Sequence, residues 1–126
     1  MRRAPLLLAA VLSASGCGFI GRTLQRTIDA PAEPAKIANK IRDPRREGAR
    51  LAVLWIGHAT ALVQIDDAYF LTDPVFTRNV GLLSPRLVEP GLEPGDVPPL
   101  AAVVISHMHF DHLSFDSLSM IEQKTK

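Results

Sequence analysis

Two uninterrupted apolar segments limit most strongly what this chain can fold into. LAVLWI spans residues 51–56 and LAAVVIS spans residues 100–106, and each has the length of a single strand. Strands that are apolar on both sides are typical of a sheet covered on both faces. The rest of the chain holds too little apolar sequence to form both covering layers. The two segments therefore predict an α/β fold of which this chain forms only the front portion.

The sequence around these segments predicts a mostly β unit with one helix at its end. ATALVQID (59–66) alternates between its two sides, and AYFLT (68–72) follows two aspartates that suit a tight turn, which predicts a hairpin. Residues 78–99 contain five prolines and predict a long irregular loop. LSFDSLSMIEQK (113–124) predicts the opening turns of a helix.

The N-terminus has the order of a secretory signal. Two arginines precede an apolar run at 5–14, which is too short to span a bilayer, and ASGC follows at 14–17. Cys17 stands where a bacterial lipoprotein carries its lipidated residue; the alternative is an ordinary signal with an incidental cysteine. We predict that residues 1–17 are a signal peptide with a lipobox. The protein is then exported to the bacterial cell envelope and lipid-anchored on its periplasmic or extracellular face.

Residues 18–50 predict a short helix followed by a proline-rich basic tether. The helix would carry four apolar residues on one face, namely Phe19, Ile20, Leu24 and Ile28. The prolines among scattered charges are typical of a solvated linker, with an extended arm as the alternative. Residues 1–50 hold ten Lys and Arg against four Asp and Glu, without the aromatic interleaving of nucleic-acid-binding segments. This balance favours a membrane surface over nucleic acid.

Three of the four histidines lie within six residues, directly after the second apolar segment, in HMHFDH. At the end of an extended strand, His107 and His109 point the same way and can hold one cation. Asp111 and His112 splay differently and can address a second cation nearby. Imidazole and carboxylate suit zinc, manganese or iron. Histidines that merely pack, or a metal-scavenging surface tract, would explain the preceding buried strand less well.

HMHFDH matches the H-x-H-x-D-H signature of the metallo-β-lactamase superfamily. WIGHAT (55–60) and LTDPVF (71–76) further resemble the branch that contains N-acylphosphatidylethanolamine-hydrolysing phospholipase D and the ascorbate-phosphate lactonases. The resemblance covers about residues 51–120. It implies an αββα sandwich with metals at one edge of its two sheets, of which residues 51–126 form the N-terminal half.

The resemblance also implies a role for each polar residue of the motif. His107 and His109 would ligate a first zinc ion, and Asp111 and His112 a second, with Asp111 also orienting a bridging hydroxide. Outside the motif, Asp73 is interpreted as a residue that either shapes its loop or supports a ligand by holding the far N–H of a histidine. For His58, a structural role and a role beside the metals remain open.

The family completes its site with ligands far downstream of this motif, so we expect the chain to be a fragment. The implied function is a metal-dependent hydrolase whose metal-bound hydroxide attacks a phosphodiester or ester, such as a phospholipid or a small molecule. The alternatives are a non-catalytic lipoprotein remnant that binds metal weakly or not at all, and a lipoprotein scaffold that binds metal for transport. For the 126-residue chain alone we expect no turnover.

Overall fold

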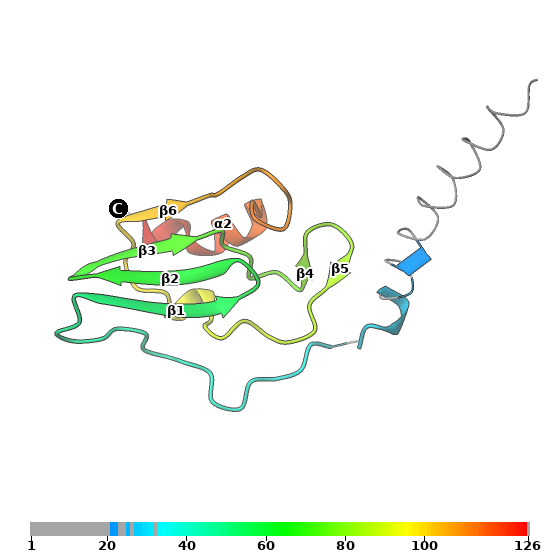
Figure 1. Cartoon of the computed structure of the whole chain (residues 1–126), viewed down its shortest axis with the longest axis horizontal. Helices are drawn as coiled ribbons and strands as arrows, with labels where there is room; N and C mark the ends of the chain where they lie inside the picture. Colours follow the sequence, from blue (N-terminus) through cyan, green and yellow to red (C-terminus); the bar gives the residue numbers. More distant parts are fainter. Residues whose placement is uncertain (1–20, 23–24, 26, 32, 126) are drawn as a thin grey trace, which may run out of the picture. The chain divides into compact units, whose positions relative to one another are not determined.

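The computed structural model describes residues 21–22, 25, 27–31 and 33–125 (Figure 1). The chain divides into two units, Met1–Ala32 and Glu33–Lys126. In the first unit the described residues up to 29 are helical, in the region where the sequence predicts a short helix. The predicted signal peptide and Cys17 lie outside the described residues. Among those that are described, no helix has the length and apolar character needed to cross a membrane.

The second unit contains a four-stranded sheet in the order β1-β2-β3-β6 (Figure 1). β1 (Leu51–Gly57), β2 (Thr60–Ile65) and β3 (Ala68–Thr72) are antiparallel neighbours. β6 (Ala102–Val104) lies parallel to β3. The strands lie where the sequence predicts them, and the hairpin between β2 and β3 turns at the two predicted aspartates. β1, β3 and β6 consequently all run in the same direction.

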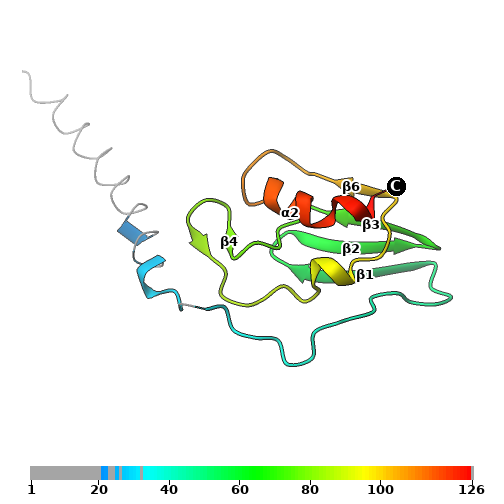
Figure 2. The ribbon, with the colours of Figure 1, turned by 180° about the vertical axis from the view of Figure 1, so that it is seen from behind.

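Only one face of this sheet is covered in the part of the chain that the structure describes. α2 (Phe115–Ile121) and the 3-10 helix η1 (Pro94–Asp96) lie together on that face (Figure 2). A second 3-10 helix, η2 (Glu122–Lys124), continues α2. The side chains buried beneath them form one apolar core, which includes Ile56, Leu62, Leu71, Phe76, Leu92, Val97, Leu100 and Ile121. The predicted mostly β portion of an α/β fold with one C-terminal helix is confirmed.

The opposite face of the sheet is apolar and exposed, as expected for a strand whose second covering layer the rest of this chain is predicted not to supply. Leu51, Val53 and Trp55 alternate along β1 with exposed fractions of 66%, 63% and 70%. On the other side of the strand Ile56 is buried, and Ala52 and Leu54 are half-buried. A large exposed apolar patch of this kind is typical of a surface that another layer or partner covers.

The loop at 78–99 is not wholly irregular. β4 (Asn79–Val80) and β5 (Ser84–Pro85) pair as a small antiparallel ribbon, and η1 follows. The buried Arg86 fixes the start of the loop, because its Nη2 donates to the Val75 carbonyl at 2.6 Å and its Nε to the Thr77 carbonyl at 3.1 Å. The prolines correctly predicted a loop without long strands, but they did not reveal these contacts.

The predicted tether is an extended arm that packs along this loop, so the solvated linker is corrected. Ala35 pairs with Val88 and Ile41 with Leu92 in two parallel bridges. Ile41 packs against the core, and Pro44 is buried. Extended backbone next to an irregular loop satisfies polar groups that neither segment pairs alone. Proline and charge content indicates an extended chain, but not whether a partner segment binds it.

We expect the docking of this arm to weaken in acid, because an ion cluster holds it. Lys40, 11% exposed, lies 3.0 Å from Glu89 and 2.6 Å from Glu93. Burial alone would lower the pKa of Lys40, but hydrogen bonds with both carboxylates raise it, and the same contact lowers the pKa of Glu89. A lowered acid pKa stabilises the fold above the unfolded value, and that contribution is lost as pH falls through the folded value.

Comparison of the chain with a Lys40→Met variant tests this cluster. The variant should unfold at a lower urea concentration than the unchanged chain at about pH 7, and the difference between their midpoints should narrow as pH falls through the lowered pKa of Glu89. Urea denaturation at several pH values measures it. A difference in urea midpoint that does not change with pH would show that the cluster does not hold the arm.

Candidate metal centre

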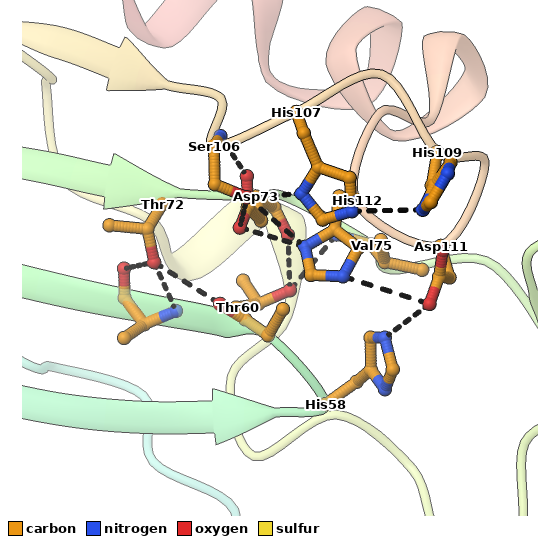
Figure 3. A network of polar contacts seen from close by, with 12 residues as sticks. His58, Thr60, Thr72, Asp73, Val75, Ser106, His107, His109, Asp111 and His112 are labelled. Atoms are coloured by element: carbon orange, nitrogen blue, oxygen red, sulfur yellow. Dashed lines mark hydrogen bonds and ion pairs between the residues drawn. The ribbon is translucent and has the colours of Figure 1, made fainter.

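Three strands deliver polar residues to one edge of the sheet. β1, β3 and β6 run in the same direction, so their carboxyl ends meet there. His58 follows β1, Asp73 follows β3, and Ser106 follows β6 by two residues. Figure 3 shows these residues around the histidines of HMHFDH, which form the turn after β6. The sheet therefore gathers residues that are far apart in sequence.

Asp73 is the buried centre of this edge, with an exposed fraction of 6%. Its Oδ1 accepts the backbone N–H of Ser106 at 2.7 Å, and its Oδ2 accepts the Ser106 hydroxyl at 2.7 Å. His112 Nδ1 lies 3.0 Å from the same Oδ2. Burial alone would raise the pKa of Asp73, but the hydrogen bonds from His112 and Ser106 lower it. Asp73 is therefore an ionised carboxylate that can only accept hydrogen bonds.

An ionised Asp73 determines which nitrogen carries the proton in two histidines. His112 must donate from Nδ1, so its Nε2 keeps a free lone pair. The Ser106 hydroxyl donates its single hydrogen to Asp73, so its oxygen accepts a hydrogen bond from His107 Nδ1, which lies 2.9 Å away. His107 Nε2 is then also a lone pair, and it faces His109 Nδ1 at 3.0 Å. Both tautomers are those that a metal ligand requires.

Asp111 lies between the imidazoles of His58 and His112. Its Oδ2 is 3.3 Å from His58 Nε2 and 3.7 Å from His112 Nε2. Burial alone would raise the pKa of Asp111, but its own backbone N–H and the neighbouring histidines lower it. The three side chains place one ligand atom each within 4.8 Å of the others, a set that can hold a metal ion. The donor chemistry of this edge thus fits zinc, manganese or iron.

Comparison with known proteins identifies the fold to which this edge belongs. Residues 68–126, which include β3, β6, the histidine turn and α2, match the family model described as a beta-lactamase superfamily domain. Residues 68–126 belong to the metallo-β-lactamase superfamily. The described sheet and helix are accordingly part of the α/β fold of that superfamily, as the HMHFDH motif predicts.

Relatives match further upstream than this family model does. An uncharacterized protein of Mycobacterium tuberculosis is 41% identical over 92 residues, which are 70% of this chain and 24% of the relative. N-acyl-phosphatidylethanolamine-hydrolyzing phospholipase D 1 of Caenorhabditis elegans is 37% identical over 56% of this chain and 21% of its own length. A metal-dependent hydrolase of Anaeromyxobacter dehalogenans is 34% identical over 56% of this chain and 23% of its own length. The chain spans about a quarter of the length of these relatives.

All six polar residues predicted for the metallo-β-lactamase site lie together at this edge: His58, Asp73, His107, His109, Asp111 and His112. The contact predicted for Asp73 with a histidine N–H is present. His58, whose role the sequence left open, contacts Asp111. The two predicted ligand pairs adjoin one another, since the His107 and His112 rings lie 4.0 Å apart.

Two residues that position the site were not predicted from the sequence. Ser106 links Asp73 to His107, as described above. Thr60, which is fully buried, donates from Oγ1 to the Asp73 carbonyl at 2.8 Å and accepts the Val75 N–H at 3.0 Å. These bonds hold the backbone at Asp73 in its unusual conformation, with φ of 38°. A threonine on the buried face of β2, which it shares with Leu62 and Gln64, is the signal that would have indicated it.

A groove of about 870 Å³ opens beside the same edge. His58, His109 and Asp111 form its polar end. The remaining wall is largely apolar and includes Trp55, Leu82, Leu83, Leu87 and Phe110, all of which are exposed. A concave apolar surface with a few convergent polar groups is the usual form of a small-molecule site.

Proposed function

We propose that this chain supplies the metal-binding edge of a metal-dependent hydrolase that cleaves a phosphodiester or an ester. The single observation that carries the proposal is the orientation of two imidazoles. Hydrogen bonds with Asp73 and Ser106 leave the Nε2 lone pairs of His112 and His107 free for cations. The names of two relatives support it, because one is a phospholipase D and the other a metal-dependent hydrolase.

The proposed resident metal is zinc, with manganese or iron as alternatives that suit the same ligands. When bound, such a cation lowers the pKa of water and polarises the bond to be cleaved. His107 and His109 would hold one cation, because their facing nitrogens lie 3.0 Å apart. Asp111 and His112 would hold the second. Asp111 Oδ2, which faces the space between the rings, would orient the attacking water by accepting its hydrogen bond.

The proposed substrate is an amphiphilic phosphodiester of the phospholipase D type. The apolar wall of the groove suits a hydrocarbon chain, and its polar end lies at the candidate metal ligands. A lipid anchor on Cys17 and a basic N-terminal segment would keep the protein at the membrane where such a substrate resides. The proposed location is therefore the bacterial cell envelope, on its periplasmic or extracellular face.

Hydrolysis by the intact protein that carries this chain tests the proposal. The protein should hydrolyse a phosphodiester or ester substrate with zinc or manganese bound, and His109→Ala should reduce kcat/KM by roughly 100-fold or more, since ligand loss exceeds the effect of losing an outer partner. Met108→Ala is the matched control, because Met108 lies beside the ligands but is exposed. Metal-loaded protein without turnover on either substrate class would contradict the hydrolase.

The 126-residue chain alone is the second part of the test. It should bind metal without turnover, because it covers about a quarter of the length of the relatives named as hydrolases and its histidine turn is exposed. Metal binding without turnover by the intact protein as well would favour the non-catalytic alternative instead. Near-stoichiometric tight binding by the chain alone, with no hydrolysis by the intact protein, would point to a metal carrier.

A further inference from the structure

We propose that His58, Asp111 and His112 together form a three-ligand cation site whose fourth position opens towards the groove. The inference rests on the proposed function for the second cation and adds His58 to it as a direct ligand. His58 stands 53 residues before Asp111 in the sequence, at the end of a different strand. The site would thus join side chains from the end of β1 and from the turn after β6.

The distances between the ligand atoms fit a tetrahedral cation. Bonds of about 2.0–2.1 Å from a metal to nitrogen and oxygen place neighbouring corners of a tetrahedron about 3.3–3.4 Å apart. Asp111 Oδ2 lies 3.3 Å from His58 Nε2 and 3.7 Å from His112 Nε2. Figure 3 shows both imidazoles directed at this oxygen. Small side-chain rotations would bring the three atoms to three corners of one tetrahedron.

The donor atom of His112 is already in the state that a cation needs, whereas His58 Nε2 lies at hydrogen-bond distance from the ionised Asp111 and would exchange its proton for the cation. Asp73 takes the Nδ1 proton of His112, so the Nε2 lone pair of His112 is directed at Asp111. His58 presents Nε2 to the same carboxylate and makes an edge contact with the His112 ring, with centroids 5.6 Å apart. The side chains of His58, Asp111 and His112 therefore converge on one space, and a cation there would contact all three.

The backbone at His58 indicates that its direction is enforced. His58 has φ of 50°, in the left-handed region that non-glycine residues seldom adopt, and Gly57 before it has φ of 144°. The Trp55 indole donates to the His58 carbonyl at 2.9 Å and holds this turn. Strained backbone is concentrated at functional sites, and Asp73, across the site, has the same feature.

The open coordination position would face the groove. His58 and Asp111 line its polar end, whereas His112 lies deeper, with its side chain 21% exposed. Three protein ligands with one free position are typical of catalytic rather than structural zinc. The site would therefore present its cation to the polar group of a molecule whose apolar part occupies the groove.

Titration of the full 126-residue chain with Co²⁺ tests the inference, because the visible absorption of Co²⁺ reports its ligands without any assay of activity. Two variants separate ligation from indirect support. His58→Ala removes the side chain, and His58→Gln keeps a hydrogen-bond donor that reaches Asp111 but no imidazole. Loss of a residue that only supports a ligand weakens metal binding by roughly 10–100-fold. If His58 is itself a ligand, the affinity for Co²⁺ should fall by more than roughly 100-fold in both variants. Met108→Ala is expected to leave the titration unchanged.

The outcomes distinguish this inference from the proposed function. Loss of the tetrahedral Co²⁺ spectrum and of affinity in both His58 variants would support His58 as a ligand. If His58→Ala binds Co²⁺ as tightly as the unchanged chain, or if His58→Gln restores the affinity, His58 is not a ligand. Either result would overturn this inference and leave the other proposed ligands in place. An unchanged chain that takes up no Co²⁺ at millimolar concentrations would overturn both this inference and the metal centre on which it rests.

Discussion

Asp73→Ala is expected to lower both the stability of the chain and its affinity for metal. The substitution removes the acceptor of two hydrogen bonds from Ser106 and one from His112, at a residue that is 6% exposed. Buried donors left unpaired cost about 1–3 kcal/mol each, so the free energy of unfolding should fall by roughly 2–4 kcal/mol. Metal affinity should fall by about 10–100-fold, because His112 and His107 no longer keep the required tautomers.

Asp73→Asn separates these two effects. Asparagine tolerates a positive φ and can still accept the Ser106 N–H, so urea denaturation should show most of the stability retained. Its amide presents N–H rather than a carboxylate to His112 or Ser106, so metal titration should still show the weaker affinity. Full metal affinity in the asparagine variant would show that Asp73 has only a structural role.

Arg86→Ala is expected to have the second largest effect, this time on stability alone. The guanidinium is 7% exposed and donates to the carbonyls of Val75 and Thr77. These two residues connect the end of β3 to the ribbon of β4 and β5. Loss of both hydrogen bonds should reduce the free energy of unfolding by roughly 2–4 kcal/mol in urea denaturation.

Arg86→Lys is the matched control for this second effect. A lysine ammonium is a single point donor and cannot span two carbonyls as the planar guanidinium does, so it should recover only part of the loss. An exposed arginine of the arm, Arg45, provides the surface comparison, and Arg45→Ala should leave the stability nearly unchanged. Equal effects of Arg86→Ala and Arg45→Ala would contradict the role of the buried contacts.

The strands and the candidate ligands were predictable because local sequence determines them. The apolar run of β1 and the alternation of β2 set the strands, and the two aspartates between β2 and β3 set the turn. HMHFDH followed a strand, so its side chains had to lie at the end of a sheet. Asp73 was predicted near a histidine because LTDPVF resembles a family motif at the end of a strand, and the structure shows that this strand and β6 are parallel and end together.

The contacts that depend on distant residues were not predictable in this way. The arm at residues 33–46 docks because Lys40 meets Glu89 and Glu93, which no local pattern links to it. The role of Ser106 depends on where its single proton goes, and that follows only from the burial of Asp73. The contact between His58 and Asp111 likewise depends on a left-handed turn after β1, which a histidine seldom adopts.

The most direct measurement of the central claim is the metal content of the intact protein. The protein is purified without chelators and compared by elemental analysis with a variant in which His107 and His112 are both replaced by alanine. The orientation of these imidazoles by Asp73 and Ser106 predicts bound zinc, manganese or iron in the unchanged protein and little in the variant. A folded, unchanged protein that holds no transition metal, or a variant that retains the same amount, would contradict it.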